Sequence, residues 1–114
     1  PVDGRIPMDV LIAGTDPSLV TFEMDLFWVT KAGHDPRTYF ARFPGRFELV
    51  HVKDSLGAPQ HTMTEVGAGM MDWKGIFAQR QTAGIKHYFV EHDEPADPME
   101  SIRRSYNFLK ALRF

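Results

Sequence analysis

Hydrophobic and polar positions follow a repeated design along this chain: short β-branched and aromatic runs that end in a carboxylate or an imidazole. The three runs are residues 19–25 (LVTFEMD), 47–54 (FELVHVKD) and 87–93 (HYFVEHD). Runs of this length and composition predict strands. Helical patterns lie between them, so the sequence predicts parallel βα units whose polar strand ends meet at one edge of a sheet.

The segments around these strands carry the start and stop signals of helices. Residues 8–13 are apolar and precede Gly14, which favours a brief helix with a glycine cap. Asp35, Asp72 and Asp97 stand where N-caps are expected, and the first and last of them directly precede proline. The helices predicted from these signals cover residues 36 to about 43, 73–83 and the segment from 98 onward.

Two segments carry further expectations. The last helix should bury one apolar stripe, which consists of Ile102, Tyr106, Leu109 and either Ala111 or Leu112. Residues 55–69 form a long, polar, glycine-rich connection, and connections of this length are usually functional lids or disordered segments. The Gly-Ala-Gly at 67–69 has no strand directly before it, so it indicates a turn rather than a dinucleotide site.

Composition narrows the class of protein. The 114 residues are expected to form one domain over residues 1–114, and 43% hydrophobic with 25% charged residues is typical of a globular chain. No apolar run approaches the roughly 20 residues that span a bilayer. A formal net charge of −2 with scattered basic residues argues against a nucleic-acid partner. The absence of cysteine excludes thiolate chemistry and fits a cytoplasmic location.

Asp25, His51 and Glu91 form the candidate chemical site, because each ends an apolar strand. Strand ends on one sheet edge converge, so these side chains should lie close together. Two carboxylates and one imidazole suit Mn²⁺, Mg²⁺, Co²⁺ or Zn²⁺ and leave positions open for a substrate. Such an ion polarises a sugar carbonyl while a carboxylate moves a proton. Each residue alone also fits a helix cap, a solvated loop end or a structural histidine, so their joint placement carries the hypothesis.

Alternation along the strands assigns side chains to faces of the sheet. His51 should share a face with Phe47 and Leu49. The same rule puts Glu23 beside Asp25 on the inner face. We therefore expect either that Glu23 is buried and hydrogen-bonded or that the strand is bulged there.

Three neighbouring side chains are candidates for contact with a substrate: Trp28, Lys53 and Asp54. Trp28 follows Asp25 by one loop turn, and its ring fits either an apolar wall for a sugar or ordinary packing. Lys53 should point the same way as His51 and could neutralise an oxyanion. Lys53 and Asp54 together equally fit a surface ion pair of small energetic value.

Four motifs resemble those of a known family. They are FEMDLFWVTKAGHDP (22–36), VHVKD (50–54), EVGAGMMDW (65–73) and FVEHD (89–93). In this order and spacing they resemble the C-terminal part of the xylose isomerase-like TIM-barrel proteins, the sugar phosphate isomerase/epimerase superfamily. The resemblance implies an α/β fold made of the last three or so parallel βα units of a (β/α)8 barrel, which is incomplete on its own.

The resemblance also implies roles for the strand-end residues. The family binds one divalent metal ion through a Glu, an Asp, a His and a final Glu, and Asp25, His51 and Glu91 match the last three. In its epimerases the first and last Glu move a proton beside the carbonyl, which makes Glu91 the expected catalytic residue. The strand that carries the first Glu should precede Pro1. Trp28 stands where ketose 3-epimerases have a substrate-binding histidine, a departure that bears on which sugar fits.

Together these features predict a metal-dependent sugar or sugar phosphate isomerase or epimerase that acts on a small-molecule sugar, with this chain inactive by itself. The alternatives are a keto-glycoside lyase or hydrolase that uses the same ion, and a non-catalytic fragment or interaction module. A bare inner face with Phe47, Leu49 and Phe89 further predicts association, either with the missing barrel portion or with a second copy of the chain.

Overall fold

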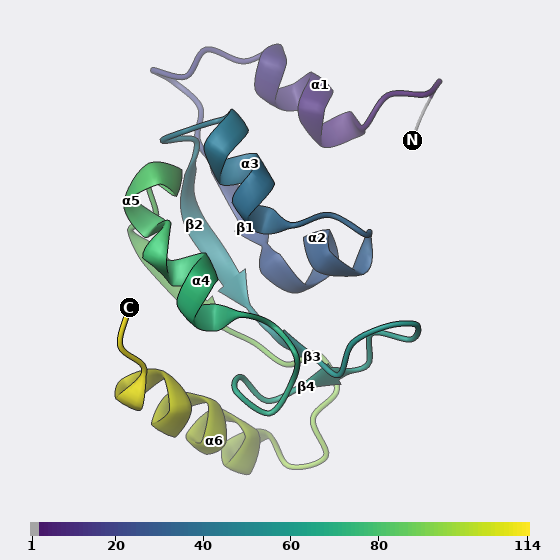
Figure 1. The fold of residues 1–114 in the computed structure, drawn as a ribbon, viewed down its shortest axis with the longest axis vertical. Coiled ribbons are helices and arrows are strands. Elements are labelled where there is room, and N and C mark those ends of the chain that lie inside the picture. The colour runs from purple at the N-terminus through teal and green to yellow at the C-terminus, as the bar shows by residue number, and fades with distance from the viewer. Residues whose placement is uncertain (1–2) are drawn as a thin grey trace.

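The computed structural model describes residues 3–114 and is built around a three-stranded parallel sheet. Its strands are β1 (Phe22–Asp25), β2 (Phe47–Val52) and β5 (His87–Val90), in the order β1-β2-β5. Figure 1 shows α1 (Pro7–Ala13) at one end of the molecule and α6 (Pro98–Ala111) at the other. The expected fold class, parallel βα units as in part of a (β/α)8 barrel, is confirmed.

Four short helices occupy the connections between these strands. They are α2 (Leu26–Lys31), α3 (Pro36–Arg42), α4 (Trp73–Ala78) and α5 (Arg80–Ala83). At the start of α2, α3, α4 and α6, an aspartate side chain accepts a hydrogen bond from a backbone N–H group of the first turn. The single helix expected over residues 73–83 is divided into two at Gln79. The N–H of Gln79 donates to the carbonyl of Ile76, three residues earlier, so the turn is tighter than in an α-helix. No helix within residues 3–114 is long and apolar enough to cross a membrane.

The connection over residues 55–69 contains a small second sheet. In it β3 (Asp54–Ser55) pairs antiparallel with β4 (Met63–Thr64). The Leu56 N–H donates to the Thr62 carbonyl at 2.9 Å and extends this pairing toward the turn. Of the two alternatives expected for this connection, disorder is wrong, because the segment pairs with itself.

Asp54 holds the end of this connection in place. Its side chain has no exposed surface, and its carboxylate accepts hydrogen bonds from the N–H groups of Gly67 and Met71 at 2.8 and 3.2 Å. The indole of Trp73 donates to it at 2.7 Å. A side chain at Gly69 would collide with the same carboxylate, so the close approach requires glycine there. The hydrogen bonds of this one buried carboxylate thus fix the position of the segment that leads into α4.

The hydrophobic core fills the space between one face of the sheet and the helices. Its central strand residues, Val50 and Val52, have no exposed surface. Aromatic rings contribute much of the volume, and Phe40 lies 5.8 Å from Phe47 between ring centroids. Other buried members of this core are Ile12, Met24, Leu26, Tyr39, Val66, Trp73, Ile76, Phe77 and Ala83.

A bulge changes which residues face the core. Between Phe22 and Glu23 of β1 the partner positions on β2 advance by two residues, so β2 carries one extra residue there. As a result Phe47 is fully buried on the helix-covered face together with Val50. The expectation that Phe47 shares the inner face with His51 is wrong, because simple alternation does not hold across the bulge.

The last helix packs only in part through the stripe expected, because Leu109 and Leu112 reach the core but Ile102 and Tyr106 do not. Ile102 and Tyr106 are 56% and 58% exposed, whereas Ser101 and Ser105 are buried. The Ser105 hydroxyl accepts a hydrogen bond from the Val66 N–H at 3.1 Å. Small serines therefore bring α6 close to the preceding loop. The apolar residues of α6 that reach the core are Phe108, Leu109 and Leu112.

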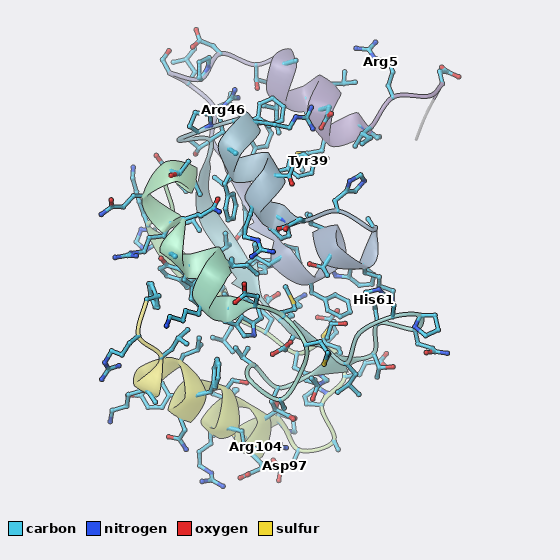
Figure 2. All side chains as sticks on the ribbon, in the orientation of Figure 1. Arg5, Tyr39, Arg46, His61, Asp97 and Arg104 are labelled. Carbon is cyan, nitrogen blue, oxygen red and sulfur yellow. The ribbon has the colours of Figure 1, made fainter. Side chains whose placement is uncertain are left out.

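Arg46 ties α1 to the sheet (Figure 2). Its largely buried guanidinium donates to the carbonyls of Ile12 and Val20 at 3.2 and 3.3 Å and to the Thr15 hydroxyl at 2.8 Å. These acceptors satisfy the donors of a buried cation, as burial of an arginine requires. The segment between α1 and β1 is thereby anchored.

The sheet is open at both edges. Within residues 3–114, β1 and β5 each pair with β2 alone, and all four residues of β5 are exposed. Among them Phe89 is 45% exposed although it is large and apolar. Unpaired edges and exposed aromatic groups are features of a surface that associates.

We expect Asp54→Ala to destabilise the protein by roughly 3–5 kcal/mol, because it leaves several buried donors without an acceptor. Chemical denaturation followed by tryptophan fluorescence measures this change. The matched control is Asp72→Ala, which removes a helix cap whose side chain is 58% exposed. The control should cost about 1 kcal/mol. Equal losses in the two variants would contradict the role assigned to Asp54.

We expect the 114-residue chain, produced by itself, to self-associate through the open sheet. Leaving its apolar side chains in water forgoes about 25 cal/mol for each Å² of apolar area, which amounts to several kcal/mol. Light scattering over a dilution series measures the association. A cooperatively folded monomer that persists on dilution would contradict this expectation.

Candidate functional site

The three strand-end residues expected to form a site lie together in the structure. Within the Asp25, His51 and Glu91 set, one possible ligand atom of each residue lies within 4.8 Å of the others. His51 Nδ1 is 3.0 Å from Glu91 Oε2 and 3.4 Å from Asp25 Oδ2. Strand register explains this meeting, because His51 pairs with Asp25 on one side and with Phe89 on the other. The expected convergence is confirmed, and metal binding by these residues stays a prediction.

The two carboxylate oxygens of Asp25 have different partners, one in the helix that follows and one in the site. Oδ1 accepts a hydrogen bond from the Trp28 N–H at 3.0 Å and caps α2. Oδ2 faces His51 Nδ1 and lies 3.1 Å from Lys53 Nζ. The helix therefore fixes the orientation of this carboxylate, which offers one oxygen to the site.

Lys53 lies among three carboxylates with a side chain only 6% exposed. Its Nζ is 2.8 Å from Asp93, 3.0 Å from Glu91 and 3.1 Å from Asp25. Burial by itself lowers the pKa of Lys53, but the hydrogen bonds to these carboxylates outweigh burial and raise the pKa above its usual range. Its three N–H groups match three acceptors. This geometry favours a role in holding the carboxylates over the expected contact with substrate.

The other two residues expected to contact substrate differ in accessibility. Asp54 is fully buried and its oxygens are occupied by donors of the protein, so it has no surface to offer a ligand. Trp28 is 48% exposed, and its backbone N–H donates a hydrogen bond to Asp25. Lys31 Nζ lies 4.8 Å from the Trp28 ring centroid. An apolar wall for a sugar at Trp28 stays a prediction.

Two further carboxylates complete what we call the acidic cluster, which consists of Glu23, Asp25, Glu91 and Asp93. Glu23 Oε1 lies 3.1 Å from His51 Nε2, on the side of the ring opposite to the other contacts. Alternation had placed Glu23 on this face, and its contact with His51 confirms that placement. Glu23 is exposed rather than buried, and the register shift beside it adds a residue to β2 rather than to its own strand. Asp93 was not singled out, although its position two residues after Glu91 was a usable signal.

The donor atoms fit a divalent ion. Two ligands at right angles around an ion, with bonds of about 2.1 Å, are about 3.0 Å apart. The separations from His51 Nδ1 to Glu91 and to Asp25 are 3.0 and 3.4 Å. Four carboxylates against the ammonium of Lys53 leave a formal charge of −3 around the imidazole of His51. Oxygen and nitrogen donors with surplus negative charge are suited to Mn²⁺, Mg²⁺, Co²⁺ or Zn²⁺.

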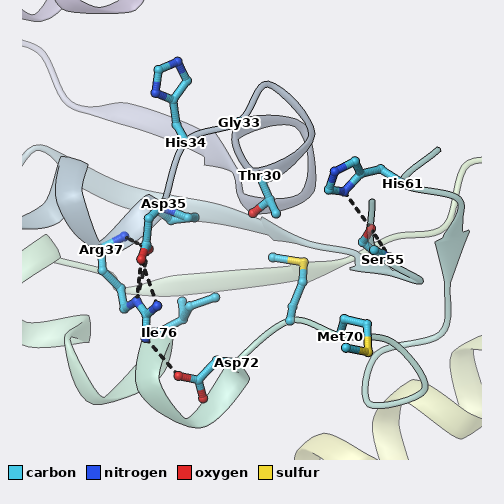
Figure 3. A pocket seen from close by; sticks show the side chains of 13 residues that line it. Thr30, Gly33, His34, Asp35, Arg37, Ser55, His61, Met70, Asp72 and Ile76 are labelled. Carbon is cyan, nitrogen blue, oxygen red and sulfur yellow. Dashed lines mark hydrogen bonds and ion pairs between the residues drawn. The ribbon is translucent and has the colours of Figure 1, made fainter. Parts of the chain in front are cut away.

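A separate pocket of about 470 Å³ lies between the segment before α3 and the start of α4 (Figure 3). In it Arg37 pairs with Asp35 and Asp72 at 2.8 and 2.9 Å, and both aspartates cap helices. His61 Nδ1 lies 3.1 Å from the Ser55 hydroxyl. These charged groups neutralise one another and hold helix starts, so we place the candidate chemistry at the strand ends.

No protein-family model and no curated protein matches the chain. Solved structures do match, among them two sugar phosphate isomerase/epimerase proteins from Parabacteroides distasonis. One is 32% identical with a TM-score of 0.77 and is matched over 96% of this chain and 37% of its own length. The other is 28% identical with a TM-score of 0.78, over 96% of this chain and 39% of its own. The chain thus spans less than two fifths of either structure. By fold and sequence identity together, it belongs to the xylose isomerase-like, sugar phosphate isomerase/epimerase superfamily.

Proposed function

We propose that the complete protein is a metal-dependent isomerase or epimerase of a small sugar or sugar phosphate. The observation that carries this proposal is the meeting of Asp25, His51 and Glu91 at the carboxyl edge of the sheet. The similarity to two Parabacteroides sugar phosphate isomerase/epimerase structures supports the same reaction class. The absence of cysteine supports a cytoplasmic location.

Asp25 and His51 would hold the ion together with Glu91. When bound, the ion would polarise a sugar carbonyl and so acidify the neighbouring C–H. Glu91 is the group placed to move that proton, because its side chain is 41% exposed. Within residues 3–114 its ion pairs involve Oε2, which leaves Oε1 to take up and return the proton.

Lys53 would keep the acidic cluster in place while this proton moves. Its raised pKa means that it stays charged, and it balances part of the negative charge of Asp25 and Glu91. A carboxylate that is held by an ammonium keeps its position when the substrate enters or leaves. The fixed geometry supports repeated proton transfer at one atom.

A keto-glycoside lyase or hydrolase on the same residues is the second candidate. The observation that favours it is the half-exposed side chain of Trp28, whose backbone N–H donates to Asp25, since aromatic faces pack against sugar rings. Product analysis with free ketoses, ketose phosphates and keto-glycosides separates the two activities. A non-catalytic module would convert none of them.

His51→Ala in the complete protein should lower the affinity for Mn²⁺ by roughly 100-fold or more, because loss of a ligand exceeds the 10–100-fold effect of losing an outer partner. Titration calorimetry measures the affinity, and circular dichroism checks the fold. His87→Ala is the matched control, because His87 is exposed at the start of β5. An unchanged titration in His51→Ala would refute the metal site.

Glu91→Gln should slow proton transfer by about 100-fold or more at saturating metal, because an amide cannot accept the proton. Incorporation of deuterium from solvent at the carbon beside the carbonyl, followed by NMR, measures this step. Glu94→Gln is the matched control, because Glu94 is an exposed carboxylate of the same loop. Wild-type incorporation in Glu91→Gln would assign the proton transfer to another group.

A further inference from the structure

We infer that Glu23 is a positioning residue that fixes the hydrogen of His51 on Nε2 and thereby presents the other nitrogen, Nδ1, to the metal ion. The inference rests on the metal site of the proposed function and extends it by one residue. Glu23 does not match any ligand that the family resemblance implies, and it lies on the far side of the imidazole from Asp25 and Glu91.

The two ring nitrogens of His51 face different partners. Nε2 lies 3.1 Å from Glu23 Oε1, a normal hydrogen-bond distance. Nδ1 faces Asp25 and Glu91. A neutral imidazole has one donor and one acceptor nitrogen, and an ionised carboxylate can only accept. A hydrogen bond across the contact with Glu23 requires the hydrogen on Nε2. The oxygens that face Nδ1, Asp25 Oδ2 and Glu91 Oε2, already lie 3.1 and 3.0 Å from the Lys53 ammonium. They therefore compete less for that hydrogen than Glu23 does, and the Nδ1 lone pair is left for an ion.

The strand geometry brings Glu23 to this position. Glu23 pairs with Leu49, which precedes His51 by two residues on the same face of β2, so the two side chains are diagonal neighbours. On the other flank the Phe89 ring meets the imidazole edge to face, with centroids 6.3 Å apart. The imidazole is thus held between a carboxylate and an aromatic ring, and both limit its rotation.

The same arrangement makes the site selective for a cation. With its hydrogen on Nε2, His51 directs a lone pair toward carboxylate oxygens of Glu91 and Asp25 at 3.0 and 3.4 Å. The Lys53 ammonium offsets part of the repulsion among these three electron-pair donors, and a divalent ion between them would offset more of it. Outer carboxylates that fix a histidine in this way typically account for 10–100-fold in metal affinity.

The first test compares Mn²⁺ affinity in the complete protein for Glu23→Ala, Glu23→Gln and the wild type. We expect Glu23→Ala to lose roughly 10–100-fold in affinity. Glu23→Gln should lose less, because its amide oxygen still accepts from Nε2. The matched control is Glu48→Ala on β2, which removes a carboxylate paired with Lys86 at 2.6 Å outside the cluster and should bind Mn²⁺ as the wild type does.

The second readout needs no metal. In histidine labelled with ¹⁵N, the nitrogen shifts of metal-free protein at alkaline pH identify the tautomer of His51, and His51→Ala assigns the signal. We expect the Nε2–H form in the wild type and a mixture of tautomers in Glu23→Ala. If the wild type binds no Mn²⁺, the proposed function fails, whereas the tautomer result still decides the role of Glu23.

Two outcomes would overturn the inference. Wild-type affinity and a wild-type tautomer in Glu23→Ala would show that Glu23 does not orient His51. Loss of Mn²⁺ binding in Glu23→Gln as complete as in His51→Ala would show that Glu23 is itself a ligand rather than a positioning residue.

Discussion

The parallel pairing of β2 with both of its neighbours is the constraint on which the candidate site depends. This register sets His51 opposite Asp25 on β1 and opposite Phe89 on β5, two residues before Glu91. Three side chains that are distant in sequence become neighbours through backbone hydrogen bonds alone. The site then follows from where each strand ends, as expected for the carboxyl edge of a parallel sheet.

The carboxylates that meet at this edge of the sheet raise the electrostatic free energy of the folded protein. Carboxylates that converge repel one another, and the largely buried ammonium of Lys53 offsets part of that repulsion through Asp25, Glu91 and Asp93. Asp25 also caps α2, so the geometry of the site is coupled to the start of a helix. The excess negative charge that remains is the physical reason to expect a divalent ion there.

The sequence predicted the strands, most helix starts and the meeting of the site residues, because these depend on local patterns and on one rule of sheet topology. The face of Phe47 was not predictable, because the bulge in β2 arises from pairing with a distant strand. Ser105 lies outside the apolar stripe predicted for the last helix, because hydrophobic periodicity does not indicate a close contact made through a small hydroxyl. The burial of Asp54 was not predictable either, because its hydrogen-bond donors are Gly67 and later residues, and no local sequence pattern connects them to Asp54. Lys53 is confined by acceptors from two other strands.

Anomalous diffraction at the manganese edge, from crystals of the complete protein grown with Mn²⁺, tests the central claim most directly. A metal site at the strand ends should give one anomalous peak shared by Asp25, His51 and Glu91, at ligand distances of about 2.0–2.3 Å. The absence of a peak at the strand ends, with Lys53 still bonded to the same carboxylate oxygens, would contradict the account. The acidic cluster would then be a purely structural ion-pair network.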